Sequence, residues 1–220
     1  MAQDRWVTFD CFGTLIDWSG GFRAALGPVA GDRTDELIGA YHAIERALEG
    51  ERPHRLYRDV LTTGLTRATA ELGLPLAPAD ADLLVRCWGD QPLFPDVPNG
   101  LQALRDAGWK LAVLTNCDDD LFAQTTARNP LLAPDLVITA QQVGSYKPTF
   151  GHFAQFERQS GVARQNWVHA ANSWFHDIEP ARRFGITCVW VDRDRSGEDP
   201  SIASRVVAGV AELAGTIATL

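Results

Sequence analysis

The chain has 220 residues, of which 45% are hydrophobic and 22% charged, and a formal net charge of −8 at pH 7. This is the balance of a globular protein, long enough for one large domain or for a core domain that carries a smaller one. The acidic charge argues against a nucleic-acid or anionic-membrane partner, because no basic stripe offsets it, and no apolar run approaches the roughly 20 residues that cross a bilayer.

Cysteine usage indicates a reducing compartment. Cys11, Cys87, Cys117 and Cys188 lie far apart, with no CxxC pair and no histidine at zinc-binding spacing. The sequence therefore predicts neither a disulfide framework nor a zinc site. The first predicted strand begins almost at the N-terminus, which leaves no room for a signal peptide. We expect a cytoplasmic protein with free thiols.

The first predicted strand, at residues 6–9, ends at a carboxylate. The run Trp-Val-Thr-Phe is β-branched and aromatic, as in a buried strand, and Asp10 follows it directly. Gly13 permits a tight turn there, and Thr14 places a hydroxyl back toward the carboxylate. An Asp after a strand is more often a turn or cap residue than a catalyst, so the interpretation of Asp10 depends on the rest of the chain.

Residues 19–90 predict helices and no strand. Apolar residues recur at helical spacing over 37–48 and 61–72, and a third helix is predicted over 78–88. Such a segment either adds stability as a bundle or caps the crevice beyond the first strand, where it would exclude water and supply specificity. Its position favours the cap, so we expect a core domain of residues 1–18 and 91–220 and a cap domain of residues 19–90.

Strands and helices alternate through the remainder of the chain. Apolar runs at 111–114, 136–139, 167–170 and 187–191 predict four more strands, with helices between them and a final helix over about 202–217. This alternation is typical of an α/β fold with a parallel sheet between two helical layers.

Polar residues follow the strands of this predicted sheet. Thr115 and Asn116 follow the second strand, Lys147 lies beyond the third, and Asn172 and Asp177 follow the fourth. Each is weak evidence alone, since a Thr-Asn pair after a strand is usually a helix cap and a loop lysine is usually solvated. Because groups at the carboxyl ends of parallel strands line one crevice, the set predicts a single site.

Together with the string Asp-Cys-Phe-Gly-Thr-Leu at residues 10–15, these groups resemble the four motifs of the haloacid dehalogenase (HAD) superfamily. The resemblance implies a three-layer, Rossmann-like α/β core with an all-helical cap inserted after the first strand. It also implies that Asp10 is the nucleophile, which forms an ester with the substrate and is held ionised by Lys147 and Thr14.

The same resemblance implies the remaining roles. Asp177 is expected to orient Lys147 and Asn172 and to help position the hydrolytic water. The substrate carboxylate is expected to bind Thr115, Asn116 and the backbone amides of Cys11 and Phe12, in the way that a helix N-terminus receives anions.

Most members of this superfamily are magnesium-dependent phosphatases, and this chain differs from them in two motif residues. Their first motif has a second Asp two residues after the nucleophile, but Phe12 stands there and cannot protonate a leaving alkoxide. Their fourth motif supplies two acids to magnesium, and the first is Asn172 here, which weakens such a site. Displacing a halide needs neither a general acid nor a metal.

The chain is therefore more similar to the L-2-haloacid dehalogenases, as residues 93–98, 145–148 and 177–185 support. This resemblance implies hydrolysis of the C2–halide bond in a small 2-substituted carboxylic acid. Asp10 displaces the halide with inversion, and water then hydrolyses the ester, without cofactor or metal. A homodimer is expected from the family alone.

The match is incomplete around the leaving group. Those dehalogenases have a cap-helix arginine there, whereas residues 37–45 contain none, and Arg46, Arg55 and Arg58 remain as alternatives. Trp174 replaces a small asparagine of the fourth motif and is a candidate substrate contact. His176 replaces a tryptophan and is more often a structural residue, but as a site residue it is a candidate donor to a leaving fluoride or amine.

Three other functions stay open on these residues. The same aspartyl attack would defluorinate fluoroacetate or open the ring of azetidine-2-carboxylate. A phosphatase of small phosphoesters with a degraded motif would need Mg²⁺. A binding protein without activity is the third alternative, although it would not require Asp10, Thr14, Lys147 and Asp177 together.

Overall fold

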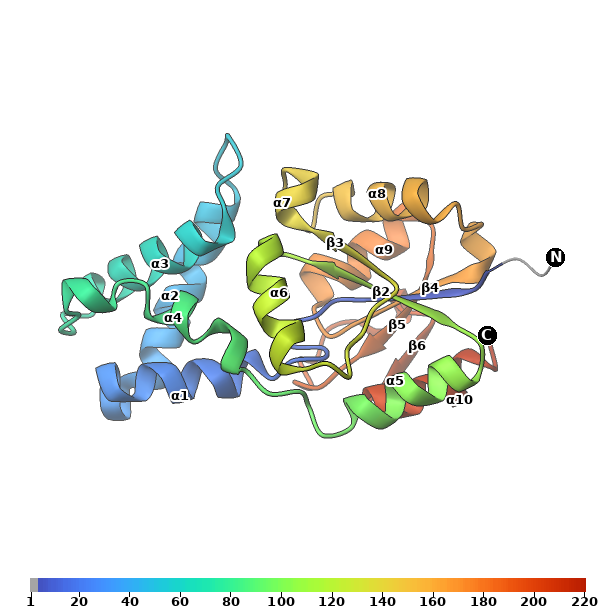
Figure 1. Ribbon diagram of the computed structural model, residues 1–220, viewed down its shortest axis with the longest axis horizontal. Coiled ribbons are helices and arrows are strands. Elements are labelled where there is room, and N and C mark those ends of the chain that lie inside the picture. The colour runs from blue at the N-terminus through green and yellow to red at the C-terminus, as the bar shows by residue number, and fades with distance from the viewer. Residues whose placement is uncertain (1–3) are drawn as a thin grey trace.

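The computed structural model describes residues 4–220 and confirms the predicted α/β fold. A six-stranded parallel sheet has the order β3-β2-β1-β4-β5-β6 (Figure 1). Its strands are β1 (Trp6–Phe9), β2 (Lys110–Thr115), β3 (Leu136–Thr139), β4 (Trp167–Ala171), β5 (Thr187–Val191) and β6 (Arg205–Val207).

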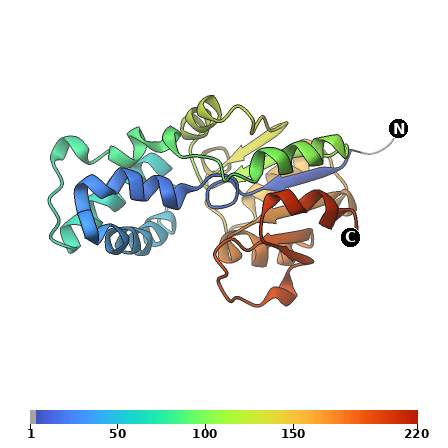
Figure 2. The same ribbon diagram turned by 90° about the horizontal axis from the view of Figure 1, so that it is seen from below.

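The register of the central strands determines where the site forms. Phe9, the last residue of β1, pairs with Val113 of β2 and with Ala170 of β4. The residues just beyond these positions, Asp10 among them, therefore lie together at the carboxyl edge of the sheet. This edge faces the helical part of the molecule (Figures 1 and 2).

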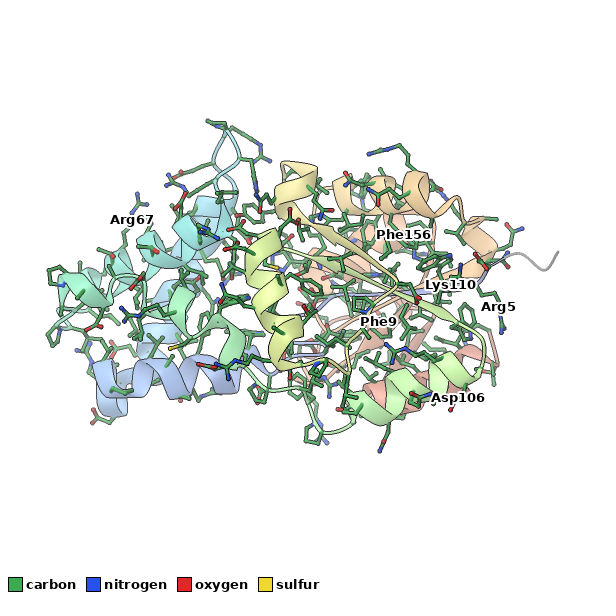
Figure 3. The ribbon with its side chains drawn as sticks, in the orientation of Figure 1. Arg5, Phe9, Arg67, Asp106, Lys110 and Phe156 are labelled. Atoms are coloured by element: carbon green, nitrogen blue, oxygen red, sulfur yellow. The ribbon has the colours of Figure 1, made fainter. Side chains whose placement is uncertain are left out.

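Two helical layers cover the sheet. Alternate residues of β1 supply both cores, because Val7 and Phe9 pack with α5 and α10 whereas Trp6 packs with Phe156 of α8 (Figure 3). No helix within residues 4–220 is both long and apolar enough to span a membrane. The core helices are α5 (Val97–Asp106), α6 (Asp119–Arg128), α7 (Ala140–Val143), α8 (Gly151–Ser160), α9 (Glu179–Phe184) and α10 (Leu213–Ile217).

The predicted final helix over 202–217 is wrong in its first part. Residues Arg205–Val207 form the edge strand β6, which pairs with β5 from Val189 to Val191, and only Leu213–Ile217 are α-helical. A three-residue strand carries too short a pattern to be recognised, and the β-branched pair Val206–Val207 becomes a strand through its pairing with β5.

Residues 18–90 form helices and loops, with no strand. The helices are α1 (Trp18–Ala30), α2 (Thr34–Glu49), α3 (Tyr57–Glu71) and α4 (Leu83–Arg86). Asp17 caps α1 by accepting a hydrogen bond from the backbone N–H of Gly20. The predicted helix over 78–88 is wrong as one element, because it is divided into short 3₁₀ turns and the four-residue α4. The division into core and cap at residues 18 and 90 stays a prediction.

A buried carboxylate joins the helical part to the sheet. Asp118 follows β2 and is 1% exposed. It accepts hydrogen bonds from the backbone N–H groups of Tyr57 (2.8 Å) and Arg58 (2.9 Å), at the N-terminus of α3. Tyr146 adds a bond from its hydroxyl to the carbonyl of Arg55 (2.7 Å). A negative charge is favoured at a helix N-terminus, so Asp118 both caps α3 and holds it against the core.

Replacing Asp118 by alanine should therefore destabilise the protein more than removing a neighbouring exposed acid. We expect Asp118→Ala to lower the free energy of unfolding by about 2 kcal/mol, because the backbone N–H groups of Tyr57 and Arg58 lose a charged acceptor. Asp120→Ala removes an exposed ion pair with Arg58 and should cost less than about 1 kcal/mol. Urea unfolding measures both values, and equal losses would contradict the capping role.

Candidate active site

Both carboxylate oxygens of Asp10 are held in place at the end of β1. Oδ1 accepts from Lys147 Nζ at 2.8 Å, and Oδ2 accepts from Thr14 Oγ1 at 2.7 Å. The Thr14 hydroxyl accepts in turn from the backbone N–H of Asn172. Gly13 makes this loop possible, since its φ is +92° and a Cβ there would lie 2.9 Å from Trp18 Nε1. Asp10 is thus a fixed, nearly buried carboxylate.

Lys147 is the buried cation of the site. Its ammonium group donates to Asp10 Oδ1 (2.8 Å), to Asp177 Oδ1 (2.8 Å) and to the carbonyl of Leu114 (2.9 Å). Burial opposes the charge, but the two carboxylates outweigh it and raise the pKa of Lys147. Burial likewise opposes the charge of Asp177, whose pKa is lowered by Lys147 and His169. The predicted contact of Asp177 with Lys147 is present.

His169 supports Asp177 from within the sheet, a feature that the sequence analysis missed. Trp167 Nε1 donates to Thr8 Oγ1 at 2.8 Å, and His169 Nδ1 lies 2.9 Å from the same hydroxyl. Because a carboxylate oxygen can only accept, His169 Nε2 donates to Asp177 Oδ1, 2.9 Å away. The other oxygen, Asp177 Oδ2, is buried without a hydrogen-bond partner among residues 4–220.

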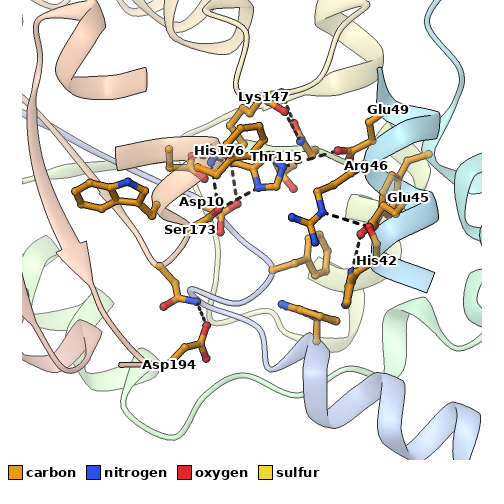
Figure 4. Close-up of a pocket in the computed structure, with 18 of the residues that line it drawn as sticks. Asp10, His42, Glu45, Arg46, Glu49, Thr115, Lys147, Ser173, His176 and Asp194 are labelled. Carbon is orange, nitrogen blue, oxygen red and sulfur yellow. Dashed lines mark hydrogen bonds and ion pairs between the residues drawn. The ribbon is translucent and has the colours of Figure 1, made fainter. Parts of the chain in front are cut away.

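A cavity of about 410 Å³ opens above Asp10, between the sheet edge and α2 (Figure 4). Its volume is that of a small-molecule site. Thr14 lies behind Asp10 rather than in the wall, and the buried Cys11 is also outside the lining. The predicted site residues that line the cavity are Asp10, Phe12, Thr115, Asn116, Lys147, Asn172, Trp174 and Asp177.

Two asparagines of the predicted site are held by neighbouring loops. Asn116 Oδ1 accepts from the backbone N–H of Lys147 at 2.7 Å, and its Nδ2 donates to the Lys147 carbonyl at 3.1 Å. Asn172 donates to Asp194 (2.7 Å) and accepts from the backbone N–H of Arg193 (3.0 Å), so these groups rather than Asp177 hold its side chain. Both positions are thus fixed by backbone contacts, and their roles toward a substrate stay predictions.

The helix α2 closes the cavity from the opposite side. The guanidinium of Arg46 points into the cavity, with Nε 3.4 Å from the carbonyl of His42 (Figure 4). Of the other two arginines considered for the leaving group, Arg55 pairs with Glu51 and Arg58 pairs with acids that follow β2. Arg46 is therefore the candidate for that position, although it follows the stretch in which the sequence analysis looked for it.

Comparison with known proteins places these features in a family. A family model described as haloacid dehalogenase-like hydrolase matches residues 5–185. The chain belongs to this family. It is a hydrolase, as predicted, and the sheet with its helical part is the fold of that family.

Several individual proteins similar to this hydrolase are dehalogenases. Haloacetate dehalogenase H-2 of Moraxella sp. (strain B) is 23% identical over 225 residues, covering 97% of this chain and 99% of the relative. The L-2-haloacid dehalogenase of Xanthobacter autotrophicus, with chloropropionic acid covalently bound, has a TM-score of 0.83 at 18% identity over 99% of both chains. Phosphoserine phosphatase of Thermus thermophilus is 33% identical over 110 residues, 50% of this chain and 44% of the phosphatase. The predicted resemblance to carbon–halide hydrolases is confirmed at family level.

The oxygen donors of this hydrolase fit magnesium poorly. Magnesium requires near-ideal octahedral oxygen coordination, and at least one or two carboxylates must be free to supply it beside waters and substrate oxygens. Here the Lys147 ammonium binds both Asp10 and Asp177, and the Asn172 side chain is turned to Asp194 and Arg193. Within residues 4–220 no group of three or more His, Cys, Asp or Glu side chains is arranged to hold a metal.

Proposed function

We propose that this hydrolase is a 2-haloacid dehalogenase, which cleaves the C2–halogen bond of a small 2-halocarboxylic acid through an ester on Asp10. The observation that carries the proposal is the fixed Asp10 carboxylate facing a small cavity whose adjacent wall is an aromatic ring. Phe12, at the position of the phosphatase acid, packs on Trp88 with ring centroids 4.4 Å apart. A ring at this position is compatible with a halide leaving group, because a halide leaves without being protonated. The dehalogenase relatives support the same chemistry.

In the first step, an Asp10 oxygen forms a bond to C2 and the halide leaves with the electron pair of the C2–halogen bond. Lys147 and Thr14 hold the carboxylate at its attack angle. The substrate carboxylate binds the backbone amides of Cys11 and Phe12 beside Thr115 and Asn116. Trp174, whose ring packs on Trp190 with centroids 5.2 Å apart, forms part of the cavity wall.

In the second step, water attacks the carboxyl carbon of Asp10 and releases a 2-hydroxy acid. Asp177 Oδ2 is the buried acceptor without a partner among residues 4–220, and a water bonded to it would be oriented toward the ester. The Lys147 ammonium, 2.8 Å from Asp10 Oδ1, stabilises the oxyanion that forms on that carboxyl group. The homodimer and the cytoplasmic location stay predictions.

A magnesium-dependent phosphatase is the second candidate, since the phosphoserine phosphatase of Thermus thermophilus matches half of this chain. The donor set described above argues against it. The alternatives of fluoroacetate and azetidine-2-carboxylate share the attack of Asp10 and differ from a chloro or bromo acid only in the leaving group.

A substrate panel with and without metal separates these candidates. We expect halide release from bromoacetate, chloroacetate or one enantiomer of 2-chloropropionate, unchanged by a chelator, because no step needs a metal. Asp10→Asn should lower this rate by about 10⁴-fold or more, whereas Asp106→Asn, an exposed acid on α5 (Figure 3), should not. Release of phosphate from phosphoserine that a chelator abolishes would overturn the proposal.

Arg46 gives a second prediction for the same site. Arg46→Gln should lower kcat for chloride and bromide substrates by about 100-fold, because the departing halide loses the positive charge facing it. Arg67→Gln, which removes an exposed arginine of α3 outside the cavity (Figure 3), is the matched control and should leave kcat unchanged. Steady-state halide release measures both, and equal kcat values for the two variants would contradict the assignment.

A further inference from the structure

The far wall of the cavity contains a second acid besides the arginine. Back-side attack by Asp10 leaves the departing atom on the opposite side of C2, against the last turn of α2. Arg46 and Glu49 of that turn and His176 line the cavity there (Figure 4). An ionised carboxylate beside a departing anion repels it, whereas a protonated carboxyl group can donate a hydrogen bond to it.

The two acids of α2 in the cavity differ in their partners. Glu45 accepts hydrogen bonds from Tyr41, His42 and Tyr57, which lower its pKa although it is buried. The Glu49 side chain is 11% exposed, its Oε2 lies 3.8 Å from His176 Nε2, and the Asn116 amide also bonds to it.

Burial and the charge of Glu45 raise the pKa of Glu49 well above its ordinary value, against the opposing effects of Lys147 and of the Asn116 amide. Burial beside a second carboxylate therefore favours the neutral form of the Glu49 carboxyl group. The titratable and charged groups around it are Tyr41, Glu45 and Arg46 on α2, Tyr57 on α3, Tyr146 and Lys147 before α8, and His176.

His176 does not convert Glu49 into its ionised form. The Ser173 hydroxyl oxygen accepts from the backbone N–H of His176 (3.2 Å) and lies 3.0 Å from His176 Nδ1, so this loop holds the ring in place. Burial lowers the pKa of His176 in spite of the nearby Asp177, so the ring is neutral and supplies no full positive charge.

We propose that the neutral carboxyl group of Glu49 donates a hydrogen bond to the departing halogen, which suits the site to 2-fluorocarboxylic acids. Fluoride is the smallest halide and the strongest hydrogen-bond acceptor among them, so its departure gains most from an O–H donor. The Asp10 oxygen forms the bond to C2, the C2–F electron pair leaves with fluoride, and the proton remains on Glu49. This inference rests on the proposed dehalogenase function.

Two substitutions of Glu49 test the donor with fluoroacetate and bromoacetate as probes. Glu49→Leu removes the donor and should lower kcat/KM for fluoroacetate by about 100-fold, with less than about a fivefold loss for bromoacetate. Glu49→Gln keeps an N–H donor and should retain fluoroacetate turnover within about tenfold. The matched controls are Glu36→Leu and Glu36→Gln on the exposed side of α2, which should change neither rate. Thermal unfolding verifies that each variant folds.

The pH profile provides a readout that a purely structural role would not move. Only protonated Glu49 donates, so kcat/KM of the unsubstituted enzyme for fluoroacetate should fall as the pH rises through the raised pKa of Glu49. Glu49→Gln should lack this alkaline fall, and bromoacetate should show it only weakly.

The outcomes separate this inference from the function on which it rests. Equal losses of fluoroacetate and bromoacetate turnover in Glu49→Leu, or an unchanged alkaline fall in Glu49→Gln, would overturn the donor role and leave the dehalogenase intact. Turnover of bromoacetate but not of fluoroacetate by the unsubstituted enzyme would also overturn the donor role and leave the dehalogenase function intact. Failure to release halide from any haloacid would overturn the proposed function itself.

Discussion

A buried ammonium group between two carboxylates is the interaction on which the site depends. Lys147 bonds to Asp10 after β1, to the carbonyl of Leu114 in β2 and to Asp177 after β4. A buried charge without partners costs several kcal/mol. The ammonium group and the two carboxylates are therefore stable in the interior only when all of these segments are folded against one another. His169 extends the network into the sheet through Asp177. The carboxylate proposed as nucleophile is therefore positioned by the fold rather than by the substrate.

The core half of the site was predictable from the sequence because strand ends are local signals. Asp10, Lys147 and Asp177 each follow a strand, and parallel pairing brings such residues to one edge. The cap half was not, since helical periodicity does not say which residue of α2 faces the cavity. His169 was taken only as part of a strand, and its bond to Asp177 depends on the turn that follows β4. Asp118 directly precedes α6 in the sequence, but its side chain caps α3, which is distant in the sequence.

The two halves of the cavity divide the chemistry between them. In the proposed reaction, the sheet edge supplies the attacking carboxylate, its cation and the acceptor for water. The helix α2 supplies Arg46 and Glu49, which line the cavity on the side proposed for the departing halogen (Figure 4). Phe12 belongs to the first half, and its ring on Trp88 joins the motif loop to the helical part.

Oxygen transfer from water tests most directly whether Asp10 forms the ester. A single turnover with enzyme in excess is run in water enriched in heavy oxygen, with a haloacid that the enzyme dehalogenates. The enzyme is then digested and its peptides are weighed. If water hydrolyses an ester on Asp10, the peptide that contains Asp10 gains one heavy oxygen and the 2-hydroxy acid contains none. Heavy oxygen in the product and none in that peptide would contradict the claim.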